Sequence, residues 1–96
     1  MELGIKLSYV EDIRNSIQKR YLSLKAEYKR DGSILSGNSS RAKEYATEMY
    51  KTANNHYLEV KYRLEDANKT DRVAKQFSRT MKSIKSYRDK ILEICT

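Results

Sequence analysis

Proline is absent from all 96 residues of the chain, while apolar residues recur every three or four positions over most of its length. Proline is the residue that most surely interrupts a helix, and apolar spacings of three and four place side chains along one helical face. Glycine, asparagine and serine cluster at one place, the stretch ILSGNSS at residues 34–40. The chain is therefore expected to be all-α, with long amphipathic helices that meet at one turn.

Residues 8–30 are predicted to form the first and shorter of two helices. Ser8 and Glu11 have the spacing of a capping box, in which each side chain bonds the backbone N–H of the other residue. Gly32 suits the point at which this helix ends. The apolar residues between these two ends form one stripe: Val10, Ile13, Ile17, Tyr21, Leu24 and Tyr28.

A second apolar face begins at Ala42 and continues, with only a small slip of register, to Ile91. Two outcomes fit this pattern: one helix over about residues 40–94, or a bend near Asn68–Asp71 that divides it. The continuous helix, with or without a kink, is favoured because no proline forces a break. The predicted fold is thus a single domain over residues 1–96, an antiparallel helical hairpin with its turn at about residues 31–39.

The two arms of this hairpin are unequal in length. A helix of about 55 residues would be roughly 80 Å long, so the first helix could cover only about half of it. The uncovered half still carries apolar positions, which implies a partner helix or a fold-back into a three-helix bundle. We call these positions, with the two before them, the apolar stripe: Val60, Leu64, Val73, Phe77, Met81, Ile84 and Ile91.

Positive charge is concentrated at the C-terminal end of a chain whose net charge is +7. Residues 69–96 hold eight basic and three acidic groups. A basic helix face can bind an acidic helix, an anionic membrane surface or nucleic-acid phosphates, although such a face is often only solvated. The basic residues predicted to form this face are Arg72, Lys75, Arg79, Lys82, Lys85 and Arg88.

No group of residues in the sequence has the spacing of a catalytic or metal site. His56 is the single histidine and falls on the apolar face, where a packed or rim position is expected. Cys95 is the single cysteine, and we expect a spare thiol at a frayed end. One histidine and one cysteine cannot build a zinc site of nitrogen and sulfur ligands. The sequence therefore predicts a protein that is not an enzyme and takes no cofactor or small-molecule substrate.

The opening residues MELGIKLSYVED have no apolar run after Lys6, so no secretory signal peptide is predicted. No stretch approaches the roughly 20 apolar residues that a transmembrane span needs. The expected location is the cytoplasm, and export by a route that reads no cleaved leader remains open.

Two short motifs resemble those of the WXG family of type VII secretion, the ESAT-like helical hairpins. Leu35-Ser36-Gly37 lies where that family has Trp-Xaa-Gly, with leucine in place of tryptophan, and Tyr62-Arg-Leu-Glu-Asp66 matches its Tyr-x-x-x-Asp/Glu export signal. The opening GIKLSYVEDI is similar in style to small proteins encoded with LXG toxins. The resemblance implies a helical hairpin that binds the helical N-terminal domain of such a toxin, or a second small helical protein, in a heteromeric complex and helps target the toxin to the export machine.

Two other functions fit the residues. A basic helical protein could bind nucleic acid, which predicts strong salt dependence. A self-associating structural coiled coil would form a stable homo-oligomer without a second protein.

Overall fold

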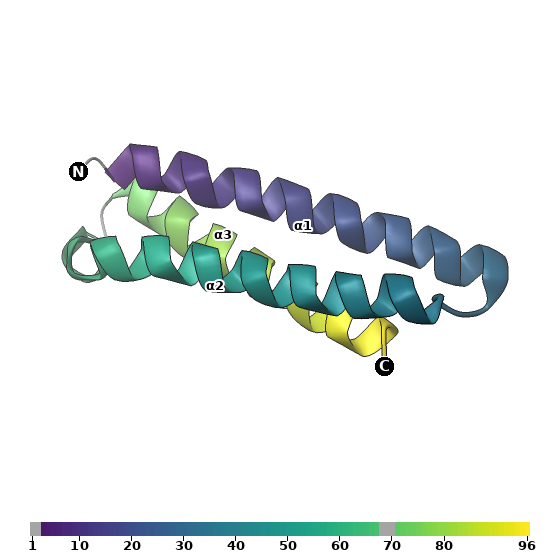
Figure 1. Cartoon of the computed structure of the whole chain (residues 1–96). Helices are drawn as coiled ribbons and strands as arrows, with labels where there is room; N and C mark the ends of the chain where they lie inside the picture. Colours follow the sequence, from purple (N-terminus) through teal and green to yellow (C-terminus); the bar gives the residue numbers. More distant parts are fainter. Residues whose placement is uncertain (1–2, 68–70) are drawn as a thin grey trace.

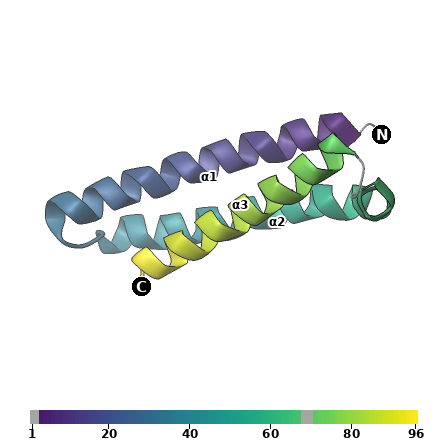
Figure 2. The ribbon, with the colours of Figure 1, turned by 180° about the vertical axis from the view of Figure 1, so that it is seen from behind.

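The computed structural model describes residues 3–67 and 71–96, and over these residues the chain forms three helices and no strand. Helix α1 spans Leu3–Asp31, α2 spans Ser36–Ala67 and α3 spans Arg72–Ile94. Helices α1 and α2 are antiparallel, and α3 lies along both of them, with its C-terminal end toward the α1–α2 turn (Figures 1 and 2). The result is an elongated bundle whose Cα atoms span 47 × 18 × 17 Å.

The all-α class is confirmed, but the two-helix hairpin is wrong. The first helix is not short, since α1 has 29 residues, and the predicted second arm over residues 40–94 is two separate helices. A continuous arm would leave its distal apolar residues in water, whereas folding α3 back buries them against α1 and α2. The fold-back into a three-helix bundle is therefore the alternative that the structure adopts.

Helix α3 begins with a side-chain cap at Asp71. The Asp71 carboxylate accepts hydrogen bonds from the backbone N–H groups of Val73 at 2.8 Å and Ala74 at 3.4 Å. These bonds satisfy two of the donors that a helix N-terminus leaves without an intrahelical partner. Of the bend predicted near Asn68–Asp71, residues 68–70 lie outside the described part of the chain.

Helix α1 begins at Leu3, five residues before the predicted capping box at Ser8. Ser8 lies inside the helix and does not cap it. Leu3 and Leu7 pack against the core, and Lys6 between them is buried. Burial of this first turn against the other helices outweighs the local capping signal.

The α1–α2 turn is shorter than predicted, because it contains only residues 32–35. Gly32 has a φ of +77°, the left-handed region that favours glycine, and its N–H donates to the Tyr28 carbonyl at 2.7 Å. Ser36 and Gly37 belong to the first turn of α2, so the predicted turn motif lies only partly in the turn. Leu35 is 68% exposed, while its neighbour Ile34 packs against the core.

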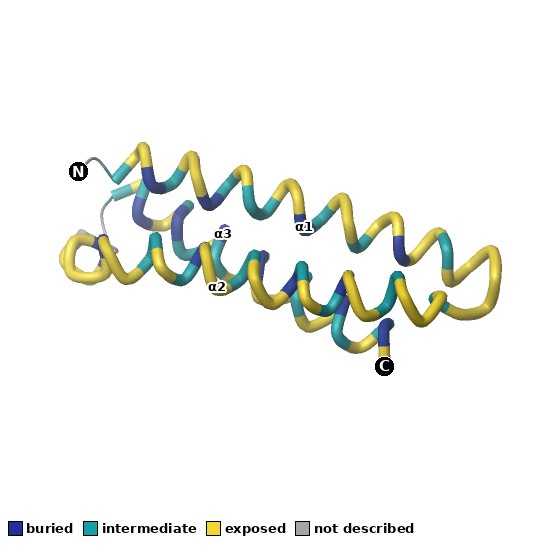
Figure 3. The backbone as a smooth tube through the Cα atoms, viewed as in Figure 1, coloured by how far each residue is buried: buried dark blue, intermediate teal, exposed yellow. Residues whose placement is uncertain are grey.

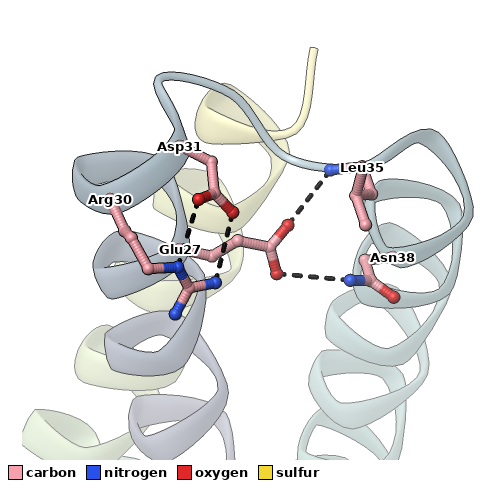
Figure 4. A network of polar contacts seen from close by, with 5 residues as sticks. All are labelled: Glu27, Arg30, Asp31, Leu35 and Asn38. Atoms are coloured by element: carbon pink, nitrogen blue, oxygen red, sulfur yellow. Dashed lines mark hydrogen bonds and ion pairs between the residues drawn. The ribbon is translucent and has the colours of Figure 1, made fainter.

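Glu27 fixes the two helices at this turn, as Figure 4 shows. Its carboxylate accepts from the backbone N–H of Leu35 at 3.1 Å and from Asn38 Nδ2 at 3.2 Å. One side chain near the end of α1 thus holds the start of α2, which sets where the second helix begins.

The core runs along the axis of the bundle, where the inward faces of all three helices are buried (Figure 3). Helix α2 contributes mainly alanines in its first half, and small side chains at a contact allow helix axes to approach. Helix α3 contributes larger side chains that fill the shared interior. The buried apolar residues are Val10, Ile17, Leu24, Ala42, Ala46, Ala53, Val60, Leu64, Ala74, Phe77, Ile84, Ile91 and Cys95.

Candidate binding surfaces

The apolar stripe lies inside the bundle rather than on its surface. Phe77, Ile84 and Ile91 are fully buried, Val60 and Leu64 nearly so, and Val73 and Met81 are half-buried. The expectation of an exposed stripe was wrong because α3 folds back and the chain covers the stripe itself. A role for these residues in binding a partner stays a prediction, and it would require α3 to leave the bundle.

Five of the six predicted basic-face residues are exposed on α3, and we call them the α3 basic row: Arg72, Lys75, Arg79, Lys82 and Lys85. No carboxylate stands among them, since α3 has no acidic residue before Asp89. Asp71 before the row and Asp89 after it mark its two ends. Among the described residues, no ion pair or hydrogen bond involves a side chain of the row.

Arg88 does not belong to this row, although it was included in the basic face predicted from the sequence. Eleven residues are slightly more than three complete helical turns, so Arg88 lies on nearly the same side of α3 as Phe77. Its side chain is only 24% exposed, its Nη2 lies 2.8 Å from Asp89 Oδ1, and its guanidinium carbon lies 4.2 Å from the centre of the Tyr50 ring. Arg88 therefore helps to join α3 to α2.

A small apolar site lies on the outer face of α2. Leu58 and Tyr62 are four residues apart, so they project from the same face, and they are 54% and 79% exposed. Glu65 and Asp66 are also exposed and follow within the next turn. The predicted export-signal residues Tyr62 and Asp66 thus share one accessible face in the last two turns of α2.

Sequence reasoning missed Leu58. The available signal was its position, two residues before Val60 and off the stripe to which Val60 and Leu64 belong. An apolar residue that breaks the period of a helix marks either an exposed contact or a wider buried face. Here it marks an exposed one.

A polar cluster joins the first turns of α1 to α2. Lys6 is 5% exposed, and its Nζ lies 2.6 Å from Glu59 Oε2 and 3.2 Å from His56 Nδ1. The hydrogen bond from Lys6 lowers the pKa of Glu59 below its usual value. The ring of Tyr9 stacks at a tilt on His56, with 5.2 Å between the ring centres. His56 is half-buried in this cluster, which confirms the expected rim position.

Lys6 was not singled out from the sequence, yet it occupies the apolar face of α1. It stands four residues before Val10, one turn away on the same side of the helix. The polar side chains of the cluster bond to one another, and a buried lysine requires such partners. It therefore serves the packing of α1 on α2.

Tyrosine and basic side chains cover the seams between helices. Arg20 lies 4.5 Å from the centre of the Tyr45 ring, between α1 and α2. Tyr21 and Tyr87 join α1 to α3 with 5.8 Å between ring centres. These contacts place Tyr21, Tyr45 and Tyr87 at the rim of the bundle, where the apolar ring packs and the hydroxyl remains near water.

Cys95 is buried at the end of α3, so the expectation of a frayed thiol was wrong. The hydroxyl of Ser39 donates to the Cys95 carbonyl at 2.6 Å. This bond connects the end of α3 to the first turn of α2.

The described residues hold no group of three or more His, Cys, Asp or Glu side chains that could ligate a metal ion. A shallow groove lies between α1 and the end of α3, lined by Tyr21, Tyr28, Lys90, Glu93, Ile94 and Thr96. No described helix is both long enough and apolar enough to cross a membrane.

Comparison of the chain with protein-family models, curated proteins and solved structures found no match. The resemblance to the WXG family therefore rests only on the residues quoted for it, and it remains a hypothesis.

Proposed function

We propose that the chain is a non-enzymatic binding protein that docks a helical partner on the outer face of α2, and that this partner is the N-terminal domain of an LXG toxin. The docking surface is inferred from the exposure of the pair Leu58 and Tyr62. Tyr62, at 79% exposed, is the most exposed large apolar side chain among the described residues. The identity of the partner comes from the resemblance to the type VII secretion family.

Leu58 and Tyr62 have the properties of interface anchors. Tyrosine is enriched among the residues that dominate binding energy, because it offers a large rigid surface and a polar tip. A pair at i and i+4 suits the ridge of a second helix packing alongside. Glu65 and Asp66 beside the pair favour a partner helix with basic residues at the matching end.

The closed core changes how such binding would work. The apolar stripe is already buried, so the partner adds to a folded surface and does not complete an unfinished bundle. A preformed surface loses little conformational entropy on binding. The same closure disfavours a coiled coil that self-associates through the apolar stripe, because the residues of the stripe are buried or half-buried within the bundle.

The position of Tyr62 and Asp66 is compatible with the export signal of the resemblance. The family has its motif after the second helix, and here the motif occupies the last two turns of α2. Both side chains are exposed, as recognition by another protein requires. We propose that the outer face of α2 contributes to targeting as well as to partner binding.

The test is co-expression of the chain with the helical N-terminal domain of an LXG toxin. We expect the two to co-purify, and the double variant L58A/Y62A to weaken the complex at least tenfold in titration calorimetry. The matched control is L22A/Y28A, which removes an exposed leucine and an exposed tyrosine from α1. Failure to co-purify, or equal losses from the two double variants, would contradict the proposal.

A further inference from the structure

The α3 basic row is an exposed row of five cations, and it lies on a different helix from Leu58 and Tyr62. Its five cations follow one another over 14 residues without a carboxylate in between. None of them is paired within the described residues. A row of cations without neighbouring carboxylates attracts a polyanion. This inference does not depend on the function proposed above.

The outer face of α3 has no apolar anchor. Every large hydrophobic side chain described between Arg72 and Ile94 is buried or half-buried. A helical protein partner would need such anchors for affinity, and a bilayer would need apolar side chains that enter it. A face of cations alone suits phosphate groups, whose binding depends on charge.

The row also has the form of a line. Arg72, Lys75, Arg79 and Lys82 step by three, four and three positions, which keeps them on one face over about 15 Å of helix axis. Duplex DNA carries about one phosphate charge per 1.7 Å of axis, so several phosphates lie within that length. The two arginines can bind phosphate oxygens with both arms of the guanidinium.

The scaffold holds this line in place. Phe77, Ile84 and Ile91 anchor the opposite side of α3 in the core, and Asp71 caps its start. The bond from Ser39 to the Cys95 carbonyl fastens its end. The cations therefore stand on a rigid helix, which reduces the entropy lost when they bind.

We propose that the α3 basic row binds the backbone phosphates of a nucleic-acid duplex without reading its sequence. A duplex is favoured over a single strand because both aromatic rings of α3 pack against the bundle, Phe77 fully buried and Tyr87 half-buried beside Tyr21, whereas unpaired bases need an open ring on which to stack. The row touches phosphates, which position a protein on a duplex but carry no sequence information.

The experiment is fluorescence anisotropy with a fluorescein-labelled 20-base-pair DNA duplex of mixed sequence, titrated with the full chain between 50 and 200 mM NaCl. With up to five phosphate contacts, the logarithm of the association constant should fall with a slope of about −4 to −5 against the logarithm of salt, or roughly 500-fold over this range. The variant K75Q/R79Q/K82Q should reduce the steepness of the slope by about 3 and bind at least roughly tenfold more weakly at 50 mM. The matched control K19Q/K29Q/K51Q removes the same net charge from exposed positions of α1 and α2.

The proposal requires the control variant to lose much less affinity than the α3 variant, and K75R/K82R to retain binding. Circular dichroism of each variant verifies that the bundle is folded. Equal losses from the two triple variants would show attraction by net charge alone and would overturn the proposal. Tighter binding to a single strand of equal length, or to vesicles containing phosphatidylserine, would overturn it as well. The same titration with an RNA duplex shows which nucleic acid the row prefers.

Discussion

Phe77 is the largest fully buried side chain of the bundle and stands on the face of α3 that the other helices cover. We predict that Phe77→Ala destabilises the chain by about 3–5 kcal/mol, because it removes buried area and leaves a cavity. That loss is a large part of the roughly 5–15 kcal/mol available to a small domain. Urea denaturation measures it, and Leu35→Ala at an exposed turn position is the control, with an expected change below about 0.5 kcal/mol. Similar values for both variants would contradict the buried stripe.

The Lys6–Glu59 pair predicts a pH dependence of stability. The hydrogen bond from Lys6 lowers the pKa of Glu59 in the folded state. A lowered pKa means that the ionised carboxylate favours folding, and this contribution is fully present above the usual glutamate pKa. It is lost as pH falls through the lowered pKa, so acid weakens the contact of α1 with α2.

The measurement is the midpoint of urea denaturation between pH 7 and pH 2.5 for the wild type and Glu59→Gln. The wild type should lose more stability over the acid range than the variant, whose amide does not titrate. Glu48→Gln, at an exposed position elsewhere on α2, is the control and should follow the wild type. Parallel curves for Glu59→Gln and the wild type would contradict a stabilising pair.

At the scale of the elements, two glycines are predicted to respond to alanine in opposite directions. Gly32 has a positive φ, so Gly32→Ala should cost about 1 kcal/mol. Gly37 lies in the first turn of α2, where an added Cβ would meet only the Arg41 guanidinium at 3.8 Å. Gly37→Ala should therefore be neutral or stabilise the chain by up to about 1 kcal/mol. Thermal melting of both variants checks this. A larger loss of stability from Gly37→Ala than from Gly32→Ala would indicate that the turn depends on the Leu35-Ser36-Gly37 motif.

The start of α3 depends on Asp71, whose carboxylate accepts two backbone N–H groups. We predict that Asp71→Ala costs about 1 kcal/mol, equivalent to a fall of about 4–8 °C in melting temperature for a domain of this size. Asp89→Ala is the matched control, since within the described part of the chain Asp89 pairs only with the neighbouring Arg88, and surface pairs contribute little. A fall at Asp89 as large as that at Asp71 would contradict the cap.

At the scale of the whole molecule, some parts of the fold can be predicted from local sequence and others cannot. The helical class, the apolar face of α1 and the turn near Gly32 follow from spacing and glycine chemistry, and all five cations of the α3 basic row follow from the same spacing. The fold-back does not, because the register of the apolar face continues almost unbroken from Val60 to Ile91. Asp71 offers a cap, but only the burial gained by α3 decides that the cap is used.

The candidate surfaces were less accessible to sequence reasoning. Arg88 was assigned to the wrong side of α3, because the row of cations was extended in steps of three residues, which drift around a helix of 3.6 residues per turn. Leu58 and Lys6 were overlooked because each interrupts a pattern, one as an apolar residue outside a stripe and the other as a charge within one. Which interruptions matter depends on the neighbouring helices, and no single helix contains that information.

The feature on which the rest of the fold depends is that the chain covers its own apolar stripe by folding α3 back. The most direct test is small-angle X-ray scattering of the purified chain, coupled to size-exclusion chromatography. The account predicts a monomer of 11.3 kDa with a radius of gyration near the 15.0 Å of the Cα atoms and a maximum dimension slightly above 47 Å. A maximum dimension of roughly 80 Å, the length of an unbroken second helix of about 55 residues, would contradict it.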